Sequence, residues 1–564
     1  MISNPWQVEH DRLRTPREDR AALVQPPLDQ VADLVDENLR NRDQLRYDLH
    51  GRSLAEISQL ARAELLADAR RWTAAYGNVP SERHDPRGLI YLAGHQPQMF
   101  HPGVWWKNFA LGELARQHGA TAVNLIVDSD ALSDASLRVP TGSVSEPQVV
   151  PIPFDRPDPK IPYEERRIEN RELFAGFGRR VVHQIAPLVA DPLMAQYWPL
   201  VCSRAEHTDN LGACLAQARH QLEGLFLGEL ATLEVPQSWV CQGEAFQWFT
   251  AHLLARLPEF RALHNEAVRE YRRAHRVRSV SHPVPELAAD GPWLEAPLWV
   301  WTAEEPRRRR LFAQSIGDEI AISDRQSWEV RLPLHADGHA GRAVERLLEL
   351  QRGGVRIRSR ALVTTLWARL ALGDLFLHGI GGAKYDRVTD LLMERFFGFR
   401  PPGFAVLSAT LHLPIERDRA TADDTRAIQR ELRDLTHHPE RHLQDCLMPF
   451  HVAQPPSAVP PFTQPGAAVP HLGAATDLTA AKRRWIETPQ TVENAQRRCH
   501  AIREVNVALQ PWLDQRRRQL LEHQARVMRR LQAESVLAWR EYAFCLYPEP
   551  TLRGFLSGLL HKTV

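Results

Sequence analysis

Three short segments of the sequence carry residue types that bind or activate polar substrates. The first is Gly94-His95-Gln96-Pro97, which directly follows the apolar run 89–93. Glycine permits close approach to the backbone, and histidine can transfer a proton or bind an anion near neutral pH. A helix predicted from about Val104 would present free N–H groups nearby. We therefore expect His95 to do chemistry and Gly94, Gln96 and Lys107 to contact the substrate; the alternative is that His95 caps a turn.

The second segment, Asp128-Ser129-Asp130, follows the apolar run 121–127. Two carboxylates at this position could bind an amine or a divalent cation, or orient His95, because a buried carboxylate needs such a partner. We predict catalytic roles for Asp128 and Asp130. A helix cap or an Asx-turn is the alternative.

The third segment runs from His378 to Asp386 and contains three glycines before a predicted helix. Successive backbone N–H groups in such a loop can surround an anionic oxygen, and a lysine adds positive charge. The spacing of a Walker loop is absent. A plain tight turn would also explain the glycines. The predicted substrate-binding residues here are His378, Gly379, Gly381, Gly382, Lys384 and Tyr385.

Metal binding receives less support from the sequence. His95, His101, Asp128 and His378 are suitable donor types, but no sequence spacing fixes how far apart they lie. We predict no resident metal. The six cysteines contain no Cys-x-x-Cys pair, which disfavours zinc ribbons and disulfide scaffolds, and we expect them to be buried and inert.

The elements that must position these segments alternate between strand and helix. Apolar residues 89–93 and 121–127 read as buried strands, and 104–118 read as a helix that stops at Gly119. This order predicts a parallel βαβ unit with His95 and Asp128–Asp130 beside one crevice. A second set follows, with a helix from Ser359 to about Leu372, a strand over 374–378, the glycine loop, a helix over 384–397 and a strand over 404–408.

The predicted fold is α/β, a Rossmann-like parallel sheet core with helical insertions and a long C-terminal coiled-coil-type helix. Residues 293–301 and 310–313 are expected to form a hairpin, whose arginine run 307–310 marks a solvated connection or, alternatively, a basic patch. The predicted organisation is an N-terminal helical layer (1–84), the first half of the core (85–163), a helical insertion (164–290), the second half of the core (291–415), a helical segment (416–450), a Pro-rich flexible linker (451–473), and the long basic helix with the C-terminal segment (474–564).

Composition is that of an ordinary globular protein. The chain has 564 residues, a formal net charge of +1 and a mean hydropathy of −0.38. So small a net charge disfavours nucleic acid as a partner. The start lacks a secretory pattern, and charged residues interrupt the most apolar stretch, 361–381. We expect a cytoplasmic protein without a membrane span.

Taken in order, these segments resemble the bacillithiol synthase family. The resemblance covers residues 85–560 and rests on Gly94–Pro97, Asp128 and Asp130, the loop ending in Lys384-Tyr385, and Leu546–Leu552. It implies a Rossmann core related to class I nucleotidyl transferases and a coiled-coil helix used for dimerisation. It also implies an enzyme that joins the carboxyl group of cysteine to the amine of a glucosaminyl malate. Gly94, Gln96 and Lys384 would then bind an anion and His95 would do the chemistry.

The sequence departs from the family pattern at three places. The family usually has glutamine at the position of His95, an acidic cluster with histidine at Asp128–Asp130, and glutamate at the position of Ala383. These differences leave the identity of the substrate open.

The leading hypothesis is a ligase-like enzyme of low-molecular-weight thiol biosynthesis that joins an amino acid, with cysteine as the candidate, to an amino sugar or similar amine. Activation of the carboxylate requires a nucleotide such as ATP or ADP, or a preactivated donor. One alternative is a nucleotidyl transferase that adenylates a small acid. Another is a non-catalytic scaffold, suggested by Ser129 and Ala383, in which the long basic helix carries partner contacts. The expected partners are a small-molecule substrate and a second copy bound through that helix.

Overall fold

The computed structural model describes residues 13–43, 46–79, 85–132, 134–157, 161–229, 232–282, 284–416, 420–443 and 472–560. The chain divides into two compact units. The first contains Met1–Thr141, Val149–Pro414 and Trp539–Val564, and the second contains Gly142–Gln148 and Ile415–Ala538. Almost all of the predicted linker 451–473 lies outside the described residues.

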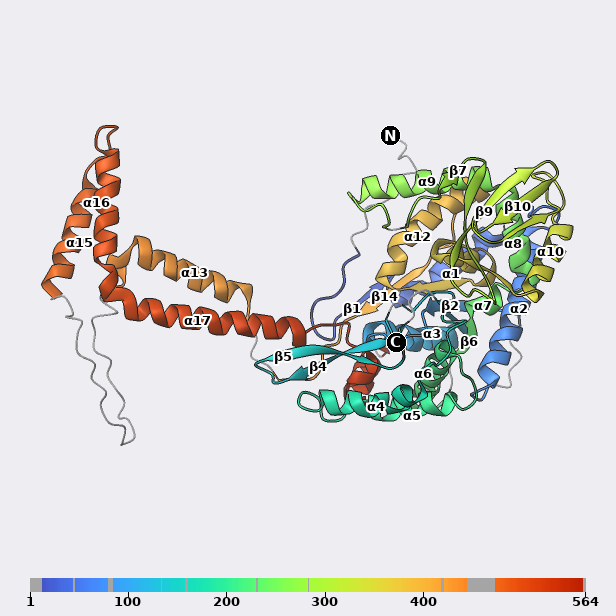
Figure 1. The fold of residues 1–564 in the computed structure, drawn as a ribbon, viewed down its shortest axis with the longest axis horizontal. Coiled ribbons are helices and arrows are strands. Elements are labelled where there is room, and N and C mark those ends of the chain that lie inside the picture. The colour runs from blue at the N-terminus through green and yellow to red at the C-terminus, as the bar shows by residue number, and fades with distance from the viewer. Residues whose placement is uncertain are drawn as a thin grey trace. The chain divides into compact units, whose positions relative to one another are not determined.

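A six-stranded sheet forms the centre of the first unit (Figure 1). Its strand order is β1 (Ala22–Gln25), β14 (Ala405–Ala409), β13 (Leu375–His378), β2 (Ile90–His95), β3 (Thr121–Ile126) and β6 (Leu233–Pro236). All neighbours are parallel except β1, which is antiparallel to β14. The predicted βαβ unit is confirmed: α3 (Pro102–His118) connects β2 to β3 and ends at Gly119, whose φ of 63° is left-handed.

The direction of the winding changes between β13 and β2. From β2 the chain proceeds to β3 on one side, and from β13 it proceeds to β14 on the other. In open parallel sheets the crevice at the carboxyl ends of the strands on either side of such a change is where ligands bind. His95 ends β2 and His378 ends β13, so both lie at this crevice.

Two strands of this sheet lie where the sequence predicts helices. β1 belongs to the predicted helical layer 1–84, and β6 belongs to the predicted helical insertion 164–290. Each strand has only four residues. A four-residue strand between long helical segments carries too few positions to show an alternating pattern, so its pairing depends on the tertiary structure.

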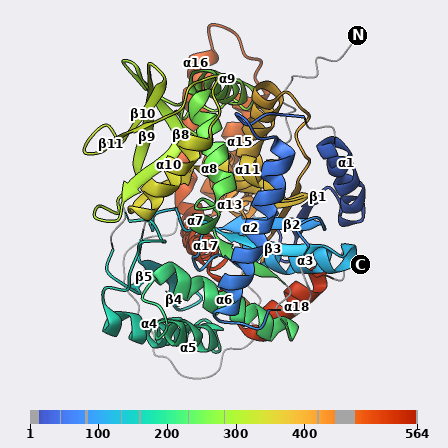
Figure 2. The ribbon, with the colours of Figure 1, turned by 90° about the vertical axis from the view of Figure 1, so that its right-hand side faces the viewer.

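Helices cover both faces of the sheet. On one face, α3 packs beside β2 and β14. The other face carries the hydrophobic core shared by α2 (Leu54–Ala74), α8 (Glu244–Ala255), α11 (Ala361–Trp367) and α12 (Ile380–Leu392) (Figure 2). Ser53 is the N-cap of α2, where a reciprocal capping box with Glu56 satisfies two free backbone donors.

A second, five-stranded antiparallel sheet corrects the prediction that 291–415 completes the parallel core. Its order is β11 (Glu329–Leu332), β10 (Glu319–Ser323), β9 (Arg309–Ile316), β8 (Trp293–Thr302) and β12 (Val355–Ser359), with β7 (Ala289–Asp290) beside β8. The predicted hairpin is confirmed as β8 and β9. Short connections join β8 to β9, β9 to β10 and β10 to β11, which suits antiparallel pairing. Of the strands in 291–415, β13 and β14 belong to the central sheet.

The remaining elements of the first unit surround these sheets. They are η1 (Leu28–Gln30), α1 (Val31–Asp43), the pair β4 (Ser136–Gly142) and β5 (Pro147–Pro153), α4 (Arg171–Ile185), α5 (Met194–Arg204), α6 (Leu211–Leu227), α7 (Gln237–Val240), α9 (Leu257–Ala274), α10 (Gly341–Arg352), η2 (Ala368–Leu372), η3 (Met393–Phe397), η5 (Phe544–Leu546) and α18 (Glu549–Leu560). None of the helices in the described part of the chain is both long and apolar enough to cross a bilayer.

The C-terminal segment belongs to the first unit. The Phe544 backbone N–H donates a 2.8 Å hydrogen bond to the Phe100 carbonyl, and the Phe544 ring stacks on Trp105 at 4.5 Å between centroids. The Tyr547 hydroxyl donates to the Leu411 carbonyl. These contacts attach the end of the chain to residues that follow β2 and β14.

The second unit is helical. It contains α13 (Ala422–His437), η4 (Pro439–Arg441), α15 (Leu472–Glu487), α16 (Ala495–Ala508) and α17 (Gln510–Leu537). The long basic helix predicted within 474–564 is divided, and α16 and α17 are separate because Pro511 in the first turn of α17 lacks the N–H that would continue α16. α17 lies antiparallel to α13, with Arg516 on Glu431 and Arg517 on Thr436, over a core containing Leu513, Leu520 and Val527.

Candidate functional site

A cavity of about 320 Å³ opens at the carboxyl ends of β2, β3 and β13. It contains ten of the twelve residues predicted to form the site, and Asp128 and Lys384 are the two that do not line it. The ten are Gly94, His95, Gln96, Lys107, Asp130, His378, Gly379, Gly381, Gly382 and Tyr385. The antiparallel sheet and α11 complete the wall with Trp299, Ser359, Arg360, Thr364 and Thr365, and Gln237 enters from α7.

His378 forms a buried pair with Asp386. Its Nε2 lies 2.8 Å from Asp386 Oδ2, and the same carboxylate accepts hydrogen bonds from Arg369 at 2.7 Å and from Thr365 at 2.6 Å. Burial opposes ionisation of Asp386, but the charge of Arg369 and the hydrogen bonds from His378 and Thr365 hold its pKa below the usual range. Burial lowers the pKa of His378, which is therefore neutral at pH 7. An ionised carboxylate only accepts, so Nε2 carries the proton and Nδ1 is left as a base.

The glycine segment is the first turn of a helix and not the predicted loop. Gly379 is the N-cap of α12, and Gly381 and Gly382 follow inside it. The N-cap Gly379 has no side chain to accept from the first N–H groups of the helix, which leaves those donors for a ligand. A Cβ at Gly382 would lie 2.7 Å from His378 Nδ1. Glycine at this position therefore keeps the basic nitrogen of His378 accessible.

Lys107 brings a buried amino group to the cavity from α3. Its Nζ donates a 2.8 Å hydrogen bond to the Gly94 carbonyl, and the residue is 4% exposed. No carboxylate in the described ranges pairs with it. Burial, reinforced by the charge of Arg219, lowers the pKa of Lys107 to about 7. An anionic ligand in the cavity would stabilise its charged form.

His95 lines the cavity together with Lys107. Its Nδ1 is 2.9 Å from the Gln96 carbonyl and its Nε2 is 3.3 Å from Asn108 Oδ1. Burial, together with the positive charges of Lys107 and Arg219, lowers the pKa of His95 well below 6.5. Both ring nitrogens face oxygen acceptors, so His95 has no lone pair directed at a substrate.

Asp130 contacts residues from two different parts of the fold. Its Oδ2 accepts a 2.8 Å hydrogen bond from Gln96, and its Oδ1 pairs with Arg308 at 2.8 Å. Arg308 belongs to the predicted solvated connection between β8 and β9, so this part of the arginine run contacts the site. Arg308 and Arg360 both lie over the Trp299 ring, at 5.0 and 4.1 Å from its centroid. The buried Nη2 of Arg360 has no hydrogen-bond partner among the described residues.

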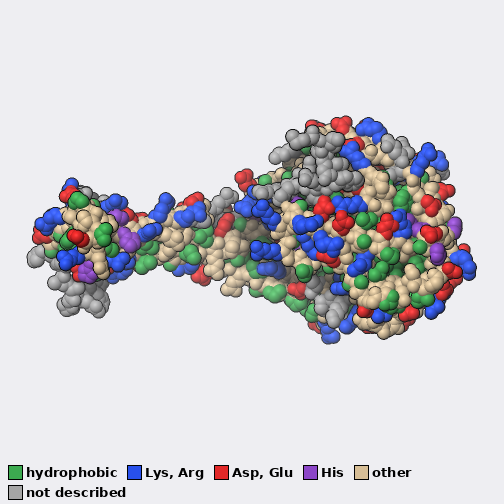
Figure 3. Space-filling model, turned by 90° about the horizontal axis from the view of Figure 1, so that it is seen from above, with side chains coloured by type: hydrophobic (Ala, Val, Ile, Leu, Met, Phe, Trp, Pro, Cys, Tyr) green, Lys and Arg blue, Asp and Glu red, His purple; other side chains and the backbone are tan. Residues whose placement is uncertain are grey.

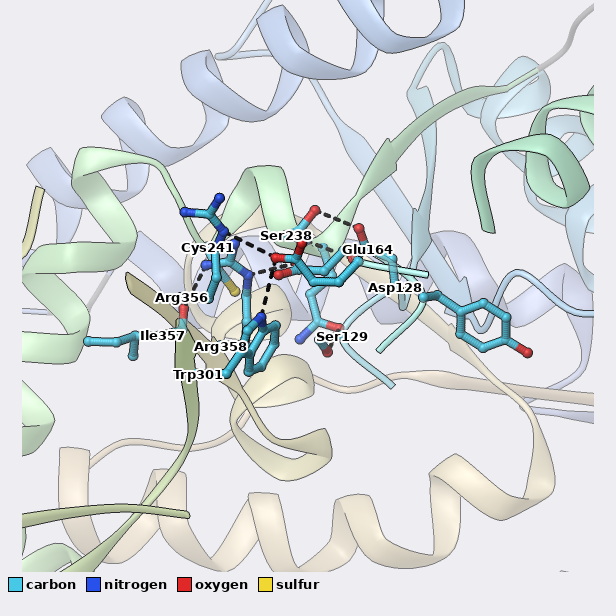
Figure 4. Close-up of polar contacts among 12 residues, drawn as sticks. Asp128, Ser129, Glu164, Ser238, Cys241, Trp301, Arg356, Ile357 and Arg358 are labelled. Carbon is cyan, nitrogen blue, oxygen red and sulfur yellow. Dashed lines mark hydrogen bonds and ion pairs between the residues drawn. The ribbon is translucent and has the colours of Figure 1, made fainter. Parts of the chain in front are cut away.

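Asp128 points away from the cavity into a buried cluster (Figure 4). Its two oxygens accept hydrogen bonds from the Ser238 backbone N–H at 2.9 Å and the Ser238 hydroxyl at 2.5 Å. Asp128 therefore caps α7, the capping alternative considered for this segment. Burial and the nearby charge of Glu164 raise its pKa to about 7. Glu164 in turn pairs with Arg358 at 2.9 Å.

The remaining predicted residues lie elsewhere. Lys384 is exposed on α12. His101 is the N-cap of α3, where its ring accepts from the Gly103 N–H, and burial lowers its pKa to about 3. Within the described ranges no three His, Cys, Asp or Glu side chains are grouped to hold a metal ion. The four metal-donor candidates are therefore not assembled into one site.

Several residues of the site were not predicted from the sequence. Asp386 was quoted in the glycine segment without a role, although a histidine and an aspartate eight residues apart across a strand-to-helix turn are a usable signal. Arg369 was noted only as interrupting an apolar stretch. Trp299, Arg308 and Arg360 come from the second sheet, whose position over the cavity has no sequence signal.

On the face shown in Figure 3, Lys and Arg side chains of the first unit are interspersed with Asp and Glu and do not form one large basic field.

Comparison of the chain with protein-family models finds no match, and a search of curated proteins finds none either.

Proposed function

We propose that this protein is a carbon–nitrogen ligase of the bacillithiol synthase type, which joins the carboxyl group of an amino acid to the amine of an amino sugar. The observation that carries the proposal is the His378–Asp386 pair at the wall of a cavity that also contains an uncapped helix N-terminus and Lys107. Amide formation needs a base for the attacking amine and hydrogen-bond donors for the oxyanion that develops.

The base in this proposal is His378 rather than His95. The attacking amine nitrogen bonds to the activated carboxyl carbon, the leaving group departs with its electron pair, and the amine proton passes to His378 Nδ1. Asp386 then stabilises the protonated ring, as a carboxylate partner of histidine does in other acyl transfers. His95 keeps a positioning role, because its ring nitrogens are engaged by Gln96 and Asn108.

The positive groups of the cavity suit the carboxyl side of the reaction. The N–H groups of Ile380, Gly381 and Gly382 and the amino group of Lys107 would hold the carbonyl oxygen or the phosphate of an activated donor. Asp130 is the acid of the cavity and would hold the ammonium form of the acceptor amine. Cysteine and the amino sugar are the substrates that the resemblance suggests, and ATP is the candidate activating nucleotide.

The proposal also includes a Rossmann-like core and a coiled-coil helix that binds a second copy. The change of winding direction between β2 and β13 supports a Rossmann-like core, and the antiparallel packing of α13 on α17 supports a coiled-coil type of arrangement. Leu521 and Met528 are about half exposed and lie seven residues apart on α17, so they would form the surface that a second copy covers.

Thiol profiling in the source organism, by mass spectrometry with this gene deleted and then restored, tests the proposal. We expect one low-molecular-weight thiol to disappear and its amino-sugar precursor to accumulate, with recovery by the wild-type gene but not by His378→Gln. An unchanged thiol pool would refute the thiol-forming role. Full recovery by His378→Gln would instead favour a non-catalytic scaffold, and ATP-dependent pyrophosphate exchange without amide product would favour a nucleotidyl transferase.

A further inference from the structure

Asp130 is the one acid among the described residues that line the cavity. The other charged groups of the wall are the amino group of Lys107 and the guanidinium of Arg360. A substrate ammonium group inside the cavity therefore has one carboxylate to bind. That carboxylate already has protein partners, because Arg308 donates to one of its oxygens and Gln96 to the other.

Arg308 can leave Asp130 more readily than the other cations can leave their partners. Its side chain is 23% exposed and that of Asp130 is 39% exposed, so the ion pair is at the rim. Such partly exposed pairs contribute little free energy. Arg360, by contrast, is held by Glu295 at 2.7 Å and by the Leu298 carbonyl at 3.2 Å.

Trp299 provides a second contact for the guanidinium of Arg308. The guanidinium already lies over the Trp299 ring, 5.0 Å from the centroid, and its only other hydrogen bond in the described structure is to the Ser129 carbonyl at 3.2 Å. If the bond to Asp130 breaks, stacking on the indole persists. The pair thus has two arrangements that differ in one ion pair.

We infer that Arg308 occupies the ammonium site of the cavity and yields Asp130 to the amine of the substrate, so that Arg308 sets the affinity and selectivity for amines. This inference rests on the proposed function, which supplies the amine, but it concerns binding and not bond formation. In the free protein Arg308 pairs with Asp130 at the rim of the cavity. A neutral molecule of the same shape cannot displace it, because it offers no charge in exchange.

The test is calorimetric titration with D-glucosamine, and with D-glucose as the neutral counterpart, into wild type, Arg308→Gln, Asp130→Asn and the control Arg307→Gln. Arg307 is adjacent in sequence and exposed, and in the described structure Asp130 pairs with Arg308 and not with Arg307. We expect Arg308→Gln to bind glucosamine about threefold to fivefold more tightly, since the competing ion pair is gone. Arg307→Gln should match wild type, and Asp130→Asn should lose the preference for glucosamine over glucose.

Two results would overturn the inference: equal, weaker or undetectable glucosamine binding by Arg308→Gln, or retained preference in Asp130→Asn with an unchanged melting temperature. The outcome is separable from that of the proposed function. The expected binding pattern together with an unchanged thiol pool would uphold the exchange at Asp130 and reject the ligase.

Discussion

His378 Nε2 lies 2.8 Å from Asp386 Oδ2, and this contact decides which nitrogen of the ring faces the cavity. The carboxylate is fixed by Arg369 and Thr365, so it does not rotate away from the histidine. The aspartate therefore controls the position of the proton as well as the orientation of the ring.

Replacing Asp386 by asparagine should lower turnover about 10²- to 10⁴-fold, the range associated with a positioned general base. The amide would donate to Nε2, which moves the proton to Nδ1 and removes the base. The control is Asp390→Asn, because Asp390 also pairs with Arg369, at 2.7 Å, but does not contact His378. Ring ¹⁵N chemical shifts of His378 would report the change of tautomer directly. Equal turnover in the two variants would contradict a role for the pair.

A methyl group at Gly382 should block the same nitrogen. Gly382→Ala places a Cβ 2.7 Å from His378 Nδ1, whereas a Cβ at Gly381 meets nothing within 4 Å. Both substitutions favour the helix, by about 0.5–1 kcal/mol. We expect Gly382→Ala to lose most activity and some stability in urea unfolding, because its Cβ must displace the buried His378 ring, and Gly381→Ala to keep both. Full activity of Gly382→Ala would show that Nδ1 is not used.

Lys107 should make stability depend on pH. Its pKa is about 7 in the folded protein, lowered by burial, and returns to about 10.5 on unfolding. The unfolded chain then binds more protons between these values, so stability rises with pH from about 7 to 10.5, by up to about 1.4 kcal/mol per pH unit. Urea unfolding at pH 7.5 and 9.5 should show this rise in wild type and in the exposed-lysine control Lys384→Met. Lys107→Met should lack it, and an equal rise in all three would place the titration elsewhere.

Asp128 should make stability change with pH in the direction opposite to that of Lys107. Its pKa is raised to about 7 by burial and by Glu164, so its contribution to stability is complete below about pH 3.8 and is lost as the pH rises through 7. Asp128→Asn should therefore gain stability relative to wild type between pH 5 and 7, by about 1 kcal/mol or more. Because Asp128 caps α7 and does not line the cavity, we expect the variant to retain activity that Asp130→Asn loses. Inactivation of a stable Asp128→Asn would restore Asp128 as a catalytic candidate.

Substitution of the exposed apolar residues of α17 tests whether this helix binds a second copy. We expect Met528→Glu combined with Leu521→Glu to convert a dimer to monomer in sedimentation velocity, because two charges would enter the apolar contact. Val492→Glu is the matched control, since Val492 is 99% exposed and lies outside α17. An identical mass for wild type and the double variant would exclude this surface as the dimer contact.

The sequence predicted the parts of the fold with long, regular patterns. The run 89–93, the helix to Gly119 and the run 121–127 were found because each buries a continuous apolar set and ends at a glycine or a polar residue. The carboxyl-end rule then predicted that His95 and Asp128–Asp130 flank one crevice, and of these His95 and Asp130 line the cavity.

The rest depended on tertiary contacts. The glycines of 379–382 have poor intrinsic helix propensity, yet α12 begins among them because its later turns pack in the core through Val388, Leu391 and Leu392. Alternation along the sequence could not show which of two neighbouring aspartates would turn inward. Asp128 faces Ser238 and Asp130 faces Arg308, and both partners are more than 100 residues away.

In the sequence, residues 415–538 of the second unit lie between the main part of the first unit and its last segment, Trp539–Val564. Residues Trp539–Val564 return to the first unit, where Phe544 stacks on Trp105 and Tyr547 bonds to Leu411. During synthesis the ribosome must add residues 415–538 before these partners emerge, which takes on the order of ten seconds at typical rates. For that interval the nascent first unit exposes the apolar surface around Trp105, and chaperones have their longest opportunity to bind the chain there.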